Sequence, residues 1–281
     1  MSIDWDDWEA QEEQGRWPGL FGKSSRRDPD DIFRGVAWGW LAMLPLLLAY
    51  EFGVAMTGGQ WENTSSLALF SMLRPLGEMA NVARWLVLLL VSAGAAYYCL
   101  KRHWALGPRL FRTVVEGMLA AMVLGPVLVL AMGALGDMLP PLPPLAVQGG
   151  DRTALGPALL IFGGAAYEEL VFRLGIYAAI FVLVGPLLRG AHLPAGKARV
   201  GADLAGLFGS ALAFAAFHLD VCVSWLGVGG ESFDAAIFTY RILAGVLLGC
   251  LFRLRGPGVA AWTHGLFNLG LLLGAGPDVF R

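Results

Sequence analysis

Residues 154–188 read ALGPALLIFGGAAYEELVFRLGIYAAIFVLVGPLL, and three of them are charged: Glu168, Glu169 and Arg173. A helix needs about 20 apolar residues to cross a bilayer, and this stretch is longer than that. Each charge near the middle of such a helix costs roughly 2.5–3.5 kcal/mol on insertion scales. Three charges kept together in an apolar helix therefore indicate mutual pairing, contact with a wet cavity, or chemistry.

The composition of the whole chain indicates a membrane protein. Hydrophobic residues make up 57% of the chain and charged residues 15%, whereas soluble domains have about 45–50% and about 25%. We predict an all-α, polytopic transmembrane bundle of seven spans. Eight is the alternative, because the fourth segment is long enough to be tilted or broken near Arg173. The predicted spans cover residues 35–55, 82–100, 114–135, 155–188, 204–226, 235–252 and 259–273.

Basic residues give the expected orientation, because Lys and Arg collect on the cytoplasmic side of a membrane. They cluster in residues 23–34 and after the second, fourth and sixth predicted spans. We therefore expect a cytoplasmic N-terminus, in a bacterial or archaeal cell membrane. Residues 1–33 form a polar cytoplasmic tail without the apolar core of a signal peptide, and residues 34–281 form the transmembrane domain.

Helical spacing separates the two adjacent glutamates. Residues four apart lie on one face of a helix, so Glu169 can pair with Arg173. Glu168 lies about 100° further round and has no basic residue at that spacing within its own helix. We therefore expect Glu168 to face a cavity.

Two later spans carry further polar residues at the same spacing. Phe214 and His218 are four apart in the fifth predicted span, and His264 and Asn268 are four apart in the seventh. Together with Glu168, these helices can present a carboxylate, two imidazoles and an amide to one point. A carboxylate and an imidazole can hold and deprotonate a water, while neutral donors stabilise an oxyanion. The pattern predicts hydrolysis of an amide by activated water, and its Glu–His–His set also suits zinc.

Three motifs resemble those of the CPBP family, which includes the CAAX prenyl endopeptidases and bacteriocin-processing or immunity proteins and is also called the ABI family. They are Glu168-Glu169-x-x-x-Arg173, Phe214-x-x-x-His218 and His264-x-x-x-Asn268. The resemblance covers about residues 155–274. It implies an intramembrane endopeptidase, of the metallo- or the glutamate type, that cleaves a lipidated or membrane-anchored peptide or protein in the lipid bilayer. No nucleic-acid partner is expected.

The resemblance also implies a role for each site residue. Glu168 would be the water-activating base, and His218 would join it in holding the water or a metal. His264 and Asn268 would form the oxyanion hole, with Glu169, Arg173 and Phe214 in support. Zinc is the candidate cofactor, with candidate ligands Glu168, His218 and His264. The metal-dependent and metal-free mechanisms both stay open.

Two other classes of function fit parts of the same pattern. A non-catalytic scaffold or a bacteriocin-immunity-type protein would keep the fold without cleaving anything. An ion- or proton-coupled transporter would use the buried carboxylates and histidines as a relay. The sequence shows no inverted repeat of the kind found in many transporters, and all three motifs are intact, so the protease interpretation is preferred.

Overall fold

The structure is a computed structural model that describes residues 29–59, 62–101, 106–138 and 155–274. Within these ranges the chain is helical, with no strand and a single isolated bridge between Leu219 and Glu231. The predicted all-α class is confirmed, and most of the predicted N-terminal tail lies outside the described residues. The elements are α2 (Pro29–Thr57), α3 (Thr64–Phe70), η1 (Ser71–Leu76), α4 (Met79–Lys101), α5 (Leu106–Met138), α6 (Leu155–Glu169), η2 (Leu170–Tyr177), α7 (Ala178–Gly190), α8 (Ala195–Ala216), α9 (Asp220–Val223), η3 (Ser224–Leu226), α10 (Ala235–Arg255) and α11 (Pro257–Gly274).

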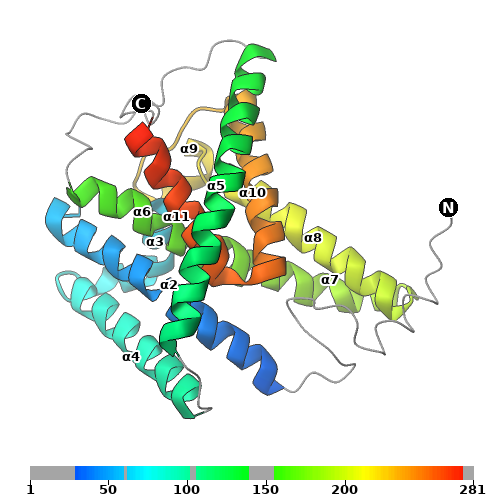
Figure 1. The fold of residues 1–281 in the computed structure, drawn as a ribbon, viewed down its shortest axis with the longest axis horizontal. Coiled ribbons are helices and arrows are strands. Elements are labelled where there is room, and N and C mark those ends of the chain that lie inside the picture. Colours follow the sequence, from blue (N-terminus) through cyan, green and yellow to red (C-terminus); the bar gives the residue numbers. More distant parts are fainter. Residues whose placement is uncertain (1–28, 60–61, 102–105, 139–154, 275–281) are drawn as a thin grey trace.

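The helices pack around α11. This helix contacts α5, α6 and α2, while α2 also lies along α6, and α8 lies between α7 and α10. Figure 1 shows α11 crossing the centre of the bundle, with α7 and α8 extending side by side away from it. The buried core between α2, α6 and α11 includes Met43, Leu46, Tyr50, Tyr167 and Ala261. This core holds the end of α6, where the two glutamates lie.

Close contact between α2 and α6 depends on a glycine. A Cβ atom added to Gly163 would lie 2.4 Å from the carbonyl oxygen of Leu46 and 2.5 Å from the backbone nitrogen of Tyr50. Both atoms belong to the backbone of α2, so a side chain could be accommodated only by separating the helices. Small residues allow this kind of backbone approach in membrane bundles.

Six helical segments of the described chain are long and apolar enough to cross a membrane. They correspond to the first six predicted spans, and the apolar helix α11 corresponds to the seventh. Its 18 residues would span about 27 Å at 1.5 Å per residue, close to the roughly 30 Å hydrocarbon core of a bilayer. On α4 and α5, large apolar side chains such as Leu89, Met122 and Leu130 are exposed, as expected for surfaces that face lipid.

The fourth predicted span is one continuous helical segment of 36 residues, Leu155–Gly190. The helix continues through Arg173, and the number of spans, seven or eight, stays a prediction. The α-helix widens at Leu170 into the π-helix η2 and becomes an α-helix again at Ala178. π-Helical turns are rare and are found frequently at functional sites.

The fifth predicted span, residues 204–226, is wrong at both ends. The helix α8 begins earlier, at Ala195, and stops at Ala216. Beyond it the chain turns back through α9 and η3, and Gly227 ends η3 with a positive φ of 76°. The apolar residues 217–226 looked like part of a span because composition alone does not distinguish a helix from an apolar return segment.

Candidate active site

One cavity of about 380 Å³ is lined by all four residues predicted to be catalytic: Glu168, His218, His264 and Asn268. Glu168 comes from the end of α6, His218 from the turn after α8, and the other two from successive turns of α11. The structure therefore brings together side chains that are up to 100 positions apart. Apolar residues of α5, α6, α10 and α11 form most of the remaining wall.

Glu168 and Glu169 lie on different sides of the cavity wall. Glu168 lines the cavity and keeps 9% of its surface exposed, whereas Glu169 has none. Behind the wall, Glu169 Oε2 lies 3.4 Å from Arg173 Nε, as the four-residue spacing predicts. Arg173 is also fully buried and donates a hydrogen bond to the carbonyl of Gly245 in α10. The pair thus joins the end of α6 to the π-helix and to α10.

His264 bridges the two glutamates. Its Nδ1 lies 3.1 Å from Glu169 Oε1 and its Nε2 lies 3.4 Å from Glu168 Oε2. Each ring nitrogen therefore faces a carboxylate oxygen, and carboxylates that are ionised only accept hydrogen bonds. This arrangement orients the ring at the cavity wall. The contact between His264 and Glu169 was not predicted, because it depends on how α11 packs against α6.

The tautomer of His218 follows from its partner. Nδ1 of His218 lies 2.8 Å from the carbonyl oxygen of Phe214, and a carbonyl can only accept, so Nδ1 carries the proton. In the neutral ring, Nε2 is then free to accept a hydrogen bond from a water. Burial lowers the pKa of His218 below its ordinary value, and the positive charge of Arg241 lowers it further. The neutral ring is therefore favoured.

Phe214 packs between the two histidines. Its ring centroid lies 5.0 Å from that of His218 and 5.9 Å from that of His264, in edge-to-face geometry. The same ring meets Phe172 at 5.3 Å, and the guanidinium of Arg173 lies over it at 5.5 Å. These contacts support the predicted packing role of Phe214.

The same cavity contains polar residues that the sequence analysis missed. Arg241 of α10 and Glu231 line it and form an ion pair through the two terminal guanidinium nitrogens, Nη1 and Nη2. Asn63 lines it from the segment before α3, and Tyr240 contributes a side chain whose hydroxyl is buried without a hydrogen-bond partner among the described residues. Arg241 could have been found, because it is a charge inside a predicted span, the same signal that marked Glu168.

The side chains around the cavity include the three candidate ligands of the predicted zinc site, Glu168, His218 and His264. Among the residues that the structure describes, no three His, Cys, Asp or Glu side chains are arranged to hold a metal ion. Nδ1 of His218 donates to a carbonyl and leaves Nε2 free as a donor atom for a metal, whereas both nitrogens of His264 face glutamates. The zinc site of Glu168, His218 and His264 therefore stays a prediction.

Comparison with known families places these motifs in context. Residues 152–270 match the family model described as "Type II CAAX prenyl endopeptidase Rce1-like". This match supports the resemblance of this part of the chain to the CPBP family. The match confirms the predicted resemblance, and it includes every residue predicted for the CPBP site. Searches of curated proteins and of solved structures found no match.

The family match supports a general class for the protein. That class is a CAAX-protease-like peptidase within the membrane, and the apolar helices make the chain an integral, multi-pass membrane protein. The match leaves out α2, α3, α4 and α5. Yet Asn63 and the α5 residues Leu124 and Leu128 line the cavity. The matched segment, residues 152–270, therefore supplies the predicted catalytic residues, while the preceding helices supply part of the cavity wall.

Proposed function

We propose that the protein is an intramembrane endopeptidase in which Glu168 and His218 activate a water. The observation that carries the proposal is the convergence of Glu168, His218, His264 and Asn268 on one cavity in a largely apolar wall. The substrate is a peptide segment of a membrane-anchored or lipidated protein. Its apolar part would lie against the cavity wall formed by residues such as Leu124 and Leu248.

In the proposed reaction, a water lies between Glu168 and Nε2 of His218. Glu168 accepts a proton as the water oxygen attacks the carbonyl carbon of the scissile bond. The carbonyl oxygen becomes an oxyanion, which the amide of Asn268 stabilises by hydrogen bonding, while His264 stays between Glu169 and the Glu168 carboxylate. The proton held by Glu168 then passes to the leaving nitrogen, and the C–N bond breaks. Glu169 and Arg173 hold His264 and the end of α6 in place.

The decisive test is Glu168→Gln in the purified full-length protein, reconstituted in lipid. Glutamine keeps the size of the side chain but cannot accept the proton. We expect cleavage to fall by about 10²–10⁴-fold, with a thermal unfolding midpoint close to that of the wild type. Glu78→Gln, an exposed residue outside the cavity, serves as the matched control. Wild-type cleavage by Glu168→Gln would refute the proposed base and would favour a role other than proteolysis.

A further inference from the structure

Asn63 contacts the proposed base from outside the segment that matches the family. It lies directly before α3, and its Nδ2 donates a hydrogen bond of 2.7 Å to Oε1 of Glu168, 105 positions along the chain. A hydrogen bond to an ionised carboxylate is stronger than one between neutral groups. The other oxygen of Glu168 faces His264. The two carboxylate oxygens thus have different partners.

The orientation of the Asn63 amide is determined by its other contacts. Oδ1 accepts a hydrogen bond of 2.8 Å from the backbone N–H of Ser65, which caps the N-terminus of α3. A backbone N–H can only donate, so the atom that meets it must be the amide oxygen, and the nitrogen must face Glu168. The backbone N–H of Asn63 in turn donates to the hydroxyl of Tyr50 in α2. Asn63 is therefore fixed both through its side-chain oxygen and through its backbone N–H.

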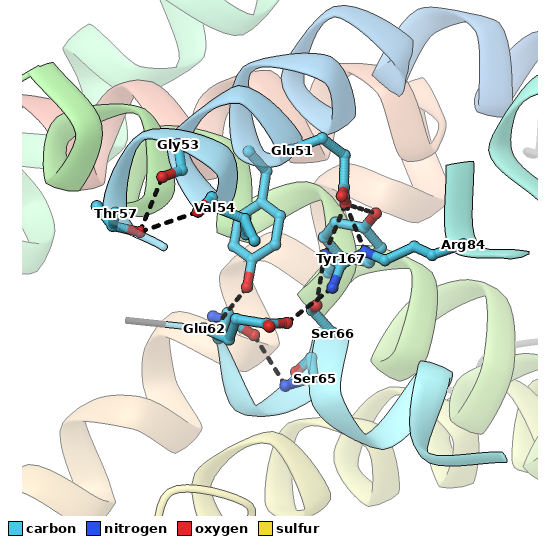
Figure 2. A network of polar contacts seen from close by, with 11 residues as sticks. Glu51, Gly53, Val54, Thr57, Glu62, Ser65, Ser66, Arg84 and Tyr167 are labelled. Atoms are coloured by element: carbon cyan, nitrogen blue, oxygen red, sulfur yellow. Dashed lines mark hydrogen bonds and ion pairs between the residues drawn. The ribbon is translucent and has the colours of Figure 1, made fainter. Parts of the chain in front are cut away.

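A buried ionic network holds the segment that carries Asn63. Figure 2 shows Arg84 of α4 at its centre, where it donates to Glu51 of α2 at 2.6 Å, to Glu62 at 2.7 Å and to Ser66 at 3.0 Å. The hydroxyl of Tyr167 donates to the same Glu51 oxygen. Glu62 immediately precedes Asn63, and Tyr167 immediately precedes Glu168. One network therefore fixes both partners of the Asn63–Glu168 hydrogen bond.

From this geometry we infer that Asn63 is a positioning residue for Glu168, a role that rests on the proposed function of Glu168 as the base. The amide occupies Oε1 and prevents the carboxylate from rotating. Oε2 is then the oxygen available to take the proton from water. The residues that act in catalysis accordingly include one outside the matched segment, residues 152–270, in the loop between α2 and α3.

Two substitutions separate this role from helix capping. Asn63→Ser keeps a good capping residue, but its hydroxyl is too short to reach Glu168. Asn63→Thr also keeps a capping hydroxyl and is likewise too short to reach Glu168. We expect both variants to unfold near the wild-type temperature and to lower kcat by about 10²-fold, the effect of a small misplacement of a catalytic group, with KM nearly unchanged. A residue that only caps α3 would leave kcat unchanged in both.

The cleavage probe is a quenched fluorescent peptide whose fourth residue from the C-terminal end is a farnesylated cysteine. It is presented to the full-length protein in lipid nanodiscs. Glu168→Gln is assayed alongside. If Glu168→Gln cleaves at the wild-type rate, the proposed function fails, and the role of Asn63 fails with it. If Glu168→Gln is inactive while Asn63→Ser and Asn63→Thr keep the wild-type kcat, only the role of Asn63 is overturned.

A second readout needs no substrate. The infrared difference between wild type and Glu168→Gln isolates the carboxylate stretch of Glu168. We expect Asn63→Ser and Asn63→Thr to shift this band, because the hydrogen bond to Oε1 is lost. A band that stays in place in both variants overturns the inference, whatever the peptide assay gives.

Discussion

At the scale of single residues, the pair formed by Glu169 and Arg173 has no exposed surface. We expect Glu169→Gln to destabilise the protein by about 3–5 kcal/mol, because removing one partner leaves the other charge buried and uncompensated. Chemical or thermal unfolding in detergent measures this loss. The double variant Glu169→Gln/Arg173→Met should lose less than the two single variants together. Wild-type stability in Glu169→Gln would show that the pair contributes nothing.

The charge of Arg241 provides a test of the state of His218. The reaction needs neutral His218, whose pKa is lowered by burial and by Arg241. A lowered pKa keeps the ring neutral to lower pH, so removing the positive charge should raise the pKa and narrow the active range. We expect Arg241→Gln to move the acidic limb of kcat/KM to higher pH, and Arg253→Gln, outside the cavity, to leave it in place. A limb that moves to lower pH would contradict the assignment.

Sequence spacing predicted which glutamate pairs with Arg173, since only Glu169 has a basic residue four positions on. It could not predict Asn63, which lies in a short polar segment where nothing distinguishes one amide from another. Glu51 and Arg84 were open to prediction, because each is a charge within a predicted span. Their mutual contact was not, because it joins two different helices whose packing the sequence does not specify.

At the scale of helices, the contact between α2 and α6 should tolerate no side chain at Gly163. An added Cβ would meet backbone atoms of α2 at 2.4–2.5 Å, so Gly163→Ala should separate the two helices. Gly94 in α4 is the matched control, because nothing lies within 4 Å of a Cβ added there. We expect Gly163→Ala to lower the unfolding temperature and the cleavage rate, and Gly94→Ala to change neither appreciably. Equal stability of the two variants would argue against the close approach.

Hydropathy located the spans because each of the six candidate segments is long and apolar. Hydropathy placed the end of the fifth span wrongly, because the apolar residues after Ala216 do not continue α8. After α8, residues 217–226 have the composition of a span, but they form only the short helices α9 and η3. Likewise, the π-helix at Arg173 has no recognised composition of its own, so the sequence suggested only that something unusual happens there.

At the scale of the whole molecule, the reaction proposed above predicts cleavage without a metal. We expect the reconstituted protein to keep cleaving its substrate after dialysis against a strong chelator, with zinc content checked by mass spectrometry. The physical reason is that Glu168 and His218 would hold and deprotonate the water without a Lewis acid. Loss of cleavage that added zinc alone restores would instead establish a metalloenzyme.

The π-helix η2 affects where the protein can lose a single residue without changing the orientation of the helices on either side. Its hydrogen bonds reach one residue further than those of an α-helix, so it holds about one extra residue. A chain lacking Leu174 could close this turn as an ordinary α-helix while α6 and α7 kept their present faces. A one-residue deletion within α6 would instead rotate Glu168 by about 100° relative to the residues that contact α2. Length variation in this segment is therefore tolerated at the widened turn and excluded from α6.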